Sequence, residues 1–369
     1  MEINMQFLKS RKFWMGLVGV LVVGGLLVLT VISINAYNRP LGPALDAIGP
    51  TASPVTDMAA PNPVVTSTVN PMSDLATPIA AASPTAILPT NTAVSLVVPA
   101  AEVCGETGAW NVLILGSDAS ELRGPKGSDL TRAARIDFSN KKVVIYAFTR
   151  DLWVTTTSVG FTNPLITTDR LGQVFYEGRN RSTQTDNRSR MLDGARANSK
   201  AMTENFTLHF NHYITVDLSQ LPSMIDKVGG LPMYVPERTT DRWIGMVIEA
   251  GQQTLDGNQV QAYARAIPDS DFARIQRNNL LLEALRQKML DPMTWIKVPQ
   301  LFQQFSNAIV TDLSPSQISN LSCLMKSMSK ESILEDEVKP EWTTPGPQES
   351  LLWDKAKVLA RLKELELIQ

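Results

Sequence analysis

From residue 104 onward, apolar and polar positions alternate in the manner of short strands and amphipathic helices. Residues 111–115, NVLIL, are a continuous apolar run that stops at Gly116, which is typical of a buried strand followed by a loop. In residues 272–290 the apolar positions recur at spacings of three and four, the pattern of a helix that packs on a sheet. By the same criteria, further strands are predicted at 135–138, 143–148, 212–216 and 233–235, and further helices at 221–228 and 256–266. Strands that alternate with helices predict an α/β fold, which we expect to be a three-layer α/β/α sandwich with a central mixed sheet.

A long apolar segment lies near the N-terminus. No charged residue occurs between Lys12 and Arg39, and residues 13–34 would rise about 33 Å as a helix, which is enough to cross a bilayer. The run is longer than the apolar stretch of about 7 to 15 residues in a cleavable signal peptide, so we favour an uncleaved transmembrane helix. Basic residues gather before it, which predicts that residues 1–12 are cytoplasmic and that the rest of this single-pass cell-membrane protein is extracytoplasmic.

Residues 35–103 have the composition of an extracytoplasmic linker. Between Pro40 and Ala101 lie 11 of the 23 prolines and no Lys or Arg. Repeated prolines favour extended conformations, and the small polar residues between them cannot bury enough surface to fold. We therefore expect a tether before a folded domain at 104–335. Residues 336–369 are expected to form a Pro-containing turn and an amphipathic helix, either solvated or docked on its apolar stripe.

Charge and cysteine content narrow the function classes. The chain has 34 Lys and Arg against 36 Asp and Glu, so it lacks the basic field of a protein that binds nucleic acid. Two cysteines are too few for a zinc site made of cysteines alone. Both Cys104 and Cys323 would lie outside the membrane, at the two ends of the folded region, so we predict a disulfide between them. The alternative is two separate buried thiols, which the apolar surroundings of Cys323 would also suit.

Arginine and aspartate gather where predicted strands and helices end. Between Gly105 and Leu280 there are 15 Arg against 5 Lys. An arginine fork grips phosphate oxygens in two places, and paired aspartates supply the hard oxygen ligands that Mg²⁺ prefers, so these stretches point to a metal–pyrophosphate ligand. One Arg-Asp pair alone is more often a structural ion pair, and the order of several stretches carries more weight. The stretches are GSD at 116–118, SD at 128–129, TRD at 149–151 and YARAIPDSDFARIQRN at 263–278.

In this order and spacing, the stretches resemble the LytR-CpsA-Psr family of cell-envelope phosphotransferases from residue 111 to about residue 285. The strongest match is GQQTLDGNQVQAYAR from Gly251, followed by Asp271 and the RIQRN spacing. The other matching features are Gly-x-Asp at 116–118, Ser-Asp at 128–129, Arg-Asp at 150–151 and Val-Gly-Gly at 228–230. An anchor and spacer before the domain also agree with the family's usual plan, although many exported proteins share it.

The resemblance implies an activity and a set of site residues. The family is understood to move a glycopolymer from an undecaprenyl pyrophosphate carrier to peptidoglycan at the outer face of the membrane. By match, Asp118 and Asp129 would hold Mg²⁺, and either Asp151 or Asp271 would accept a proton from the attacking sugar hydroxyl. The pyrophosphate would be held by Arg150, Arg265, Arg274 and Arg277, with Arg170 as a further member. Catalysis of this kind rests on positioning and charge neutralisation.

Several positions depart from the family pattern. Three of them usually hold arginine in the family, and here they are Ser120, Gly127 and Ile267. In addition, Thr149 replaces a usual proline and Asn278 replaces a usual glutamine. The change to Ile267 removes a charge and a donor fork from the expected phosphate cluster. These departures leave a second hypothesis open. In it, the protein is a catalytically weak or inactive envelope protein that binds lipid-linked saccharide or wall polymer.

Overall fold

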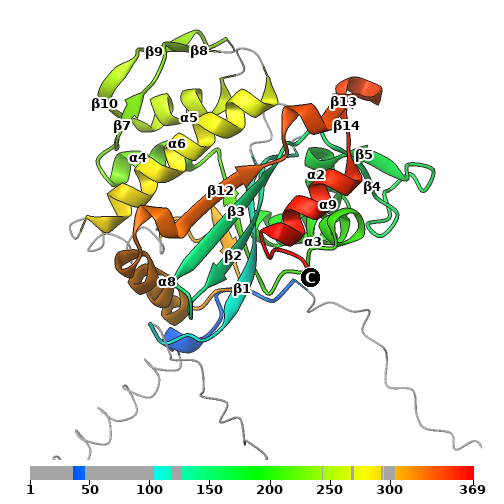
Figure 1. Cartoon of the computed structure of the whole chain (residues 1–369), viewed down its shortest axis with the longest axis horizontal. Helices are drawn as coiled ribbons and strands as arrows, with labels where there is room; N and C mark the ends of the chain where they lie inside the picture. The colour runs from blue at the N-terminus through cyan, green and yellow to red at the C-terminus, as the bar shows by residue number, and fades with distance from the viewer. Residues whose placement is uncertain are drawn as a thin grey trace, which may run out of the picture. The chain divides into compact units, whose positions relative to one another are not determined.

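A six-stranded sheet forms the centre of the folded domain (Figure 1). The computed structural model describes residues 36–45, 104–117, 127–242, 244–266, 270–291, 294 and 304–369. The strand order is β11-β6-β1-β2-β3-β12. Strand β1 runs parallel to β6 and β3 parallel to β12, while the other neighbours are antiparallel, so the sheet is mixed as expected. The strands are β1 (Ala109–Ser117), β2 (Ser128–Asp137), β3 (Lys142–Phe148), β6 (His212–Asp217), β11 (Ile309–Thr311) and β12 (Ile333–Glu337).

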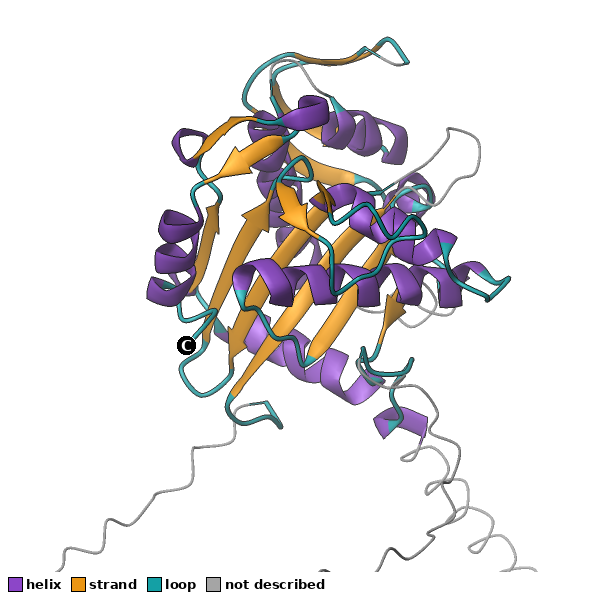
Figure 2. Ribbon diagram, turned by 90° about the vertical axis from the view of Figure 1, so that its right-hand side faces the viewer, coloured by secondary structure: helices purple, strands orange, loops and turns teal. Residues whose placement is uncertain are grey.

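Helices cover both faces of this sheet, which gives the expected three layers (Figure 2). On one face α2, α3 and α9 share an apolar core with β3, and on the other α8 packs against β1 and β2. A smaller core joins α4, α5 and α6 to a two-stranded sheet of β7 and β10. The helices are α2 (Leu171–Asn180), α3 (Asn187–Phe206), α4 (Leu221–Lys227), α5 (Gly257–Arg265), α6 (Asp271–Leu290), α8 (Pro315–Ser327) and α9 (Lys355–Glu364).

Within the described ranges, four two-stranded sheets accompany the central sheet. Their strands are β4 (Trp153–Thr155) with β5 (Thr168–Arg170), β7 (Leu231–Val235) with β10 (Gly251–Leu255), β8 (Thr239–Asp241) with β9 (Met246–Ile248), and β13 (Thr343–Pro345) with β14 (Leu351–Trp353). The β4–β5 pair follows directly on β3 and leads into α2. This pair of strands therefore connects the central sheet to the helical layer, beside the start of β2 and the end of β3.

The C-terminal residues are part of the same domain. Strand β12 spans the boundary at residue 335 that composition suggests, and it pairs with the core strand β3. Helix α9 buries Val358 and Leu362 completely in the core that it shares with α2 and α3. Asp336 of β12 accepts hydrogen bonds from Arg361 of α9 at 2.5 Å and forms an ion pair with Lys339 at 2.6 Å. The helix is therefore docked on its apolar stripe and not solvated.

A short N-terminal segment also lies against the domain. We call residues 41–45 the docked segment; composition places them in the linker. The Leu45 side chain is buried in a cluster with residues of β1, α2, α3 and β6. The N–H of Leu41 donates to the carbonyl oxygen of Leu313 over 3.2 Å. The chain thus touches the domain before residue 46 and again from Cys104 onward.

The predicted disulfide is confirmed. Cys104 and Cys323 are bonded, with their Cα atoms 5.7 Å apart, so the bond joins the start of the described domain to α8. The two thiols are therefore not separate buried groups. The predicted transmembrane helix at 13–34 lies outside the described residues, and none of the helices within the described ranges is long and apolar enough to cross a bilayer.

Candidate functional site

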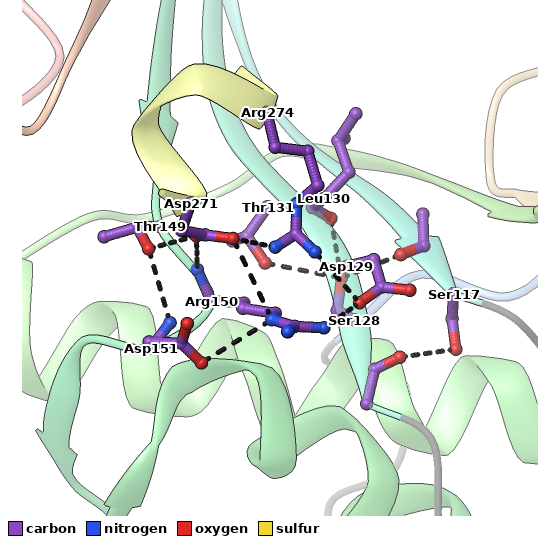
Figure 3. Close-up of polar contacts among 12 residues, drawn as sticks. Ser117, Ser128, Asp129, Leu130, Thr131, Thr149, Arg150, Asp151, Asp271 and Arg274 are labelled. Atoms are coloured by element: carbon purple, nitrogen blue, oxygen red, sulfur yellow. Dashed lines mark hydrogen bonds and ion pairs between the residues drawn. The ribbon is translucent and has the colours of Figure 1, made fainter. Parts of the chain in front are cut away.

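The ends of three elements bring charged side chains together (Figure 3). Asp129 lies at the start of β2, Arg150 and Asp151 directly follow β3, and Asp271 and Arg274 lie in the first turn of α6. All five were predicted from the sequence. The fold brings them together from positions up to 145 residues apart in the chain.

A β-bulge presents Asp129 at the edge of the site. Ser117 pairs with Ser128 while Gly116 pairs with Leu130, so Asp129 is the extra residue on β2. The hydroxyl of Ser128 donates to the carbonyl oxygen of Leu130 over 2.6 Å and stabilises the bulge. The Asp129 side chain, 33% exposed, therefore projects from a rigid support.

Arg150 stands at the centre of the cluster. Its Nη1 donates to Oδ1 of Asp129 over 2.7 Å. Its Nε lies 3.5 Å from Oδ1 of Asp151 and 3.9 Å from Oδ1 of Asp271. Burial lowers the pKa of the Arg150 guanidinium, but the charges of the three carboxylates outweigh burial and hold that pKa above its ordinary value. Arg150 is thus a fixed cation with about a third of its side chain open to solvent.

Asp271 fixes the two arginines relative to each other. One carboxylate oxygen accepts hydrogen bonds from the Thr149 hydroxyl and, over 3.2 Å, from the backbone N–H of Arg150. The other oxygen accepts from the guanidinium of Arg274. With its side chain 9% exposed and both oxygens bonded, Asp271 is a positioning residue for Arg150 and Arg274. The proton-accepting role that the sequence left open for it stays a prediction.

Asp151 has the environment of a general base. Burial raises the pKa of its carboxyl, and the nearby charge of Asp271 raises it further, against the opposing charges of Arg150, Arg274 and Arg170. Its side chain remains 20% exposed, so a ligand can reach it. A carboxylate that has a raised pKa and lies beside the arginines of the cluster is a candidate proton acceptor at neutral pH.

The other predicted arginines lie around this centre. Arg170 directly precedes α2, pairs with Trp153 across the β4–β5 sheet, and is near enough to lower the pKa of Asp151. Arg277 is buried one turn after Arg274, and its Nε donates to the carbonyl oxygen of Tyr263 over 3.2 Å. Arg265 is the last residue of α5. Arg265 thus ends the helix that precedes α6, and Arg277 links α6 to α5 through Tyr263.

Of the two aspartates predicted to bind Mg²⁺, Asp129 lies within the described residues. Asp118 lies outside the described residues, although its neighbour Ser117 pairs with Ser128, one residue before Asp129. The two arginines bind Oδ1 of Asp129, which leaves its Oδ2 for a hard cation. Asp129 therefore offers one oxygen of the kind that Mg²⁺ prefers, and the magnesium site stays a prediction. Within the described ranges no three His, Cys, Asp or Glu side chains gather into a metal-binding group.

A hollow of about 280 Å³ lies where the β4–β5 sheet meets the turn before β14. Trp153, which lines it, is two residues beyond Asp151 in the chain, and Asp169 and Gln348 provide polar groups in its wall. The remaining lining residues are Leu165, Ile166, Thr167 and Thr168. The hollow is large enough for one small polar ring, and none of the five charged residues of the cluster lines it.

Sequence reasoning missed two contributors to the site. Thr149 marked only a departure from the family pattern, yet its buried hydroxyl donates to Asp271 and accepts from the N–H of Asp151 over 3.4 Å. Its signal was a hydroxyl residue directly before Arg-Asp. Trp153 followed the same stretch but was not singled out, because an aromatic residue in a strand is usually part of the core.

Comparison with known proteins identifies the family and agrees with the fold. The model of the LytR_cpsA_psr family matches residues 76–359. Regulatory protein MsrR of Staphylococcus aureus is 24% identical over 215 residues, which are 57% of this chain and 58% of MsrR. The polyisoprenyl-teichoic acid–peptidoglycan teichoic acid transferase TagU of Enterococcus faecalis is 24% identical over 210 residues, 56% of this chain and 62% of TagU. The chain thus spans about three fifths of these relatives.

The crystal structure of TagV from B. subtilis has the same fold. It superposes with a TM-score of 0.57 over 72% of this chain and 99% of the TagV chain, at 19% sequence identity. The match includes the central mixed sheet on which the candidate site is built. Because the family model covers well over half of the residues, the chain belongs to the LytR-CpsA-Psr family.

Proposed function

We propose that the protein is a membrane-anchored, Mg²⁺-dependent phosphotransferase that moves a glycopolymer from a polyprenyl pyrophosphate carrier to peptidoglycan. The observation that carries the proposal is the pair Arg150 and Arg274, held by Asp271 beside the exposed carboxylate of Asp129. Two fixed cations next to a cation ligand suit a diphosphate. TagU and TagV are named as transferases from a polyisoprenyl-linked donor to peptidoglycan, which supports the same class of reaction.

In this proposal the arginines bind the diphosphate oxygens and orient the phosphorus atom that carries the sugar. The acceptor hydroxyl oxygen forms a bond to that phosphorus, and the bond to the polyprenyl phosphate oxygen breaks. The proton of the hydroxyl passes to the carboxylate of Asp151, and polyprenyl phosphate leaves with the electron pair. The products are a phosphodiester and a polyprenyl monophosphate, so atoms and charge balance.

Asp129, together with Asp118, would hold Mg²⁺ against the diphosphate. The ion would supply positive charge that neutralises the phosphate oxygens as the bond to the leaving group breaks. Arg150 forms its shortest ion pair with Asp129, at 2.7 Å. The same carboxylate would therefore fix both the cation and the central arginine.

The hollow lined by Trp153 is the proposed position of the acceptor sugar. Trp153 is the first residue of β4 and follows Asp151 by two positions, so their Cα atoms are at most about 7 Å apart and a ring against Trp153 would lie near the base. An aromatic face with a few polar groups around it is a common way to hold a small polar ring. Asp169 and Gln348 provide these polar groups.

The deciding experiment uses the full chain in vesicles with a polyprenyl pyrophosphate-linked saccharide and a peptidoglycan fragment. Release of polyprenyl phosphate and formation of the phosphodiester are followed with Mg²⁺ and with a chelator. We expect both products only with Mg²⁺, and their loss in Arg150→Ala. Arg238→Ala is the matched control, because Arg238 forms an exposed ion pair with Glu249 outside the site.

The departure at Ile267 favours a second candidate function, a protein that binds lipid-linked saccharide without turnover. Its expected result in the same experiment is saturable donor binding that Arg150→Ala abolishes, with neither product formed at any Mg²⁺ concentration. That result would reject the transferase proposal and support the binding protein.

A further inference from the structure

The docked segment is held by an arginine of α3. Nη2 of Arg188 donates to the carbonyl oxygen of Leu41 over 2.6 Å. Nη1 of the same side chain donates to the carbonyl oxygens of Ser306 at 2.6 Å and Ile309 at 3.2 Å. One guanidinium therefore ties the N-terminal chain to the residues around the edge strand β11. Each hydrogen bond from a charged donor is of the stronger kind.

The rest of the docked segment is fixed just as closely. The carbonyl oxygen of Pro43 accepts from the Tyr213 hydroxyl over 3.2 Å, and that of Leu45 accepts from Nε of Arg196 over 3.1 Å. The Leu45 side chain is only 7% exposed. A Cβ atom at Gly42 would lie 2.7 Å from the carbonyl oxygen of Thr311, so only glycine fits there. Packing this close indicates a built contact.

The segment meets the domain toward the end of the sheet that lies away from the candidate site. In Figure 1 it lies, in blue, at the end where β1 begins, and the β8–β9 hairpin lies at the opposite end. The turn between β2 and β3 is at the same end as the segment, because Asp137 pairs with Lys142 there. Lys141 and Lys142 are exposed on this turn.

The stretch of chain between the predicted transmembrane helix and the docked segment is short. Six residues lie between the end of the predicted transmembrane helix at Ile34 and Leu41, so the Cα atoms of Ile34 and Leu41 are at most about 25 Å apart. A tether of residues 35–103 would reach more than about 200 Å when fully extended. The docked segment therefore decides between a domain at the membrane and a domain far from it.

We propose that the docked segment holds the domain directly on the membrane, with the β2–β3 turn toward the lipid and the candidate site at the far end of the sheet. The site then lies about 30 Å above the lipid, the length of β2, so the proposed donor reaches it only if its polyprenyl chain leaves the bilayer over that distance. Residues 46–103 connect two points fastened to the same domain, and they do not set its distance from the membrane. Lys141 and Lys142 suit an anionic lipid surface.

The experiment measures which end of the domain lies near the lipid. The full chain is placed in vesicles that contain anionic lipid and a headgroup-linked energy acceptor. A donor dye is attached either through Asn140→Cys, in the β2–β3 turn, or through Arg242→Cys, in the β8–β9 hairpin. We expect several-fold more energy transfer from position 140 than from position 242. Equal transfer from the two positions would overturn the proposal.

A double variant, Leu45→Asp with Arg188→Ala, then tests the cause of the orientation. It should remove the difference between positions 140 and 242, because the buried leucine and the main clamp are both lost. Arg190→Ala is the matched control, since Arg190 lies on the same helix and its side chain makes none of these contacts. A difference that survives in the double variant would also overturn the proposal.

Hydrogen exchange of the same samples shows whether each variant folds. Amides of residues 41–45 should lose protection in the double variant while those of β1 and β3 keep theirs. If the amides of residues 41–45 are unprotected in the wild type, that result would contradict the docked segment itself. None of these measurements depends on turnover, so they stand apart from the test of the proposed function.

Discussion

Arg150 is surrounded by three carboxylates before any ligand arrives, and this sets how it can act. Asp129, Asp151 and Asp271 hold the guanidinium in one orientation, so little ordering remains to be done when a diphosphate binds. The same carboxylates repel a dianion. A divalent cation at Asp129 would reduce that repulsion, which explains why arginines and aspartates occur together here.

Arg150→Lys tests the need for a planar fork. Lysine keeps the charge, but it cannot contact Asp129 and Asp151 at once, and we expect turnover to fall about 10- to 100-fold, from the loss of one charged hydrogen bond. The measurement is the initial rate of polyprenyl phosphate release. Arg238→Lys serves as control. An unchanged rate would show that Arg150 acts only as a point charge.

The raised pKa of Asp151 predicts a pH dependence. As a base, Asp151 is active when deprotonated, so the rate should rise with pH through the pKa of that carboxyl, which lies above the ordinary value of about 3.9. Asp151→Asn should lower the rate about 10²- to 10⁴-fold and remove this rise. Asp137→Asn, at the other end of β2, should leave the profile unchanged. A wild-type rise centred below the ordinary value would contradict the assignment.

At this scale the sequence predicted which residues meet but not how they divide the work. Asp151 and Asp271 were equal candidates for the proton, because both follow the same family pattern. The structure distinguishes their surroundings, because the Thr149 hydroxyl donates a hydrogen bond to the carboxylate of Asp271. A contact between residues 122 positions apart depends on how β3 and α6 are packed, and local sequence does not record that packing.

At the scale of elements, the close approach of α2 to β2 explains one departure from the family pattern. A Cβ atom at Gly127 would overlap the carbonyl group of Gly172 in the first turn of α2. The N–H of Gly172 in turn donates to the carbonyl oxygen of Arg150 over 2.8 Å. Gly127 therefore lets α2 support the backbone of the central arginine, at a position where an arginine side chain has no room.

Gly127→Arg restores the residue usual in the family, and we expect it to harm this protein. Its Cβ atom must push α2 away from Arg150, at a cost of about 1–3 kcal/mol in unfolding free energy, with a lower transfer rate. Urea unfolding and the rate assay measure both effects. Asn278→Gln restores another family residue on the partly exposed side of α6 and should be tolerated. A faster or more stable Gly127→Arg variant would show that α2 can move without loss.

The elements that the sequence predicted are those with large apolar residues at regular spacing, such as β3, β6 and α6. Helix α3 was not predicted, because residues that face α2 are small, Gly194 and Ala197 among them, and leave no visible apolar stripe. Strand β2 was predicted only from residue 135. Arg132, which interrupts its apolar pattern, is buried in the strand, and burial lowers its pKa to about 10.

At the scale of the whole molecule, the disulfide closes a loop that contains nearly the entire domain. In the chain-entropy model, a loop of 219 residues stabilises the folded state by about 5 kcal/mol, as an upper figure. The double variant Cys104→Ser with Cys323→Ser should therefore unfold at clearly lower urea concentration. The wild type treated with a reductant should match it. Equal unfolding midpoints for the oxidised and reduced wild type would show that the bond adds no stability.

The position of this bond also bears on how the protein is made. In a chain exported from its N-terminal end, Cys104 crosses the membrane 219 residues before its partner. Until Cys323 follows, Cys104 is a free thiol that can react with other proteins or with oxidants. In a chain exported in this way the bond forms only after most of the domain has crossed, and we expect the yield of mature protein to depend on the thiol-oxidising capacity outside the membrane.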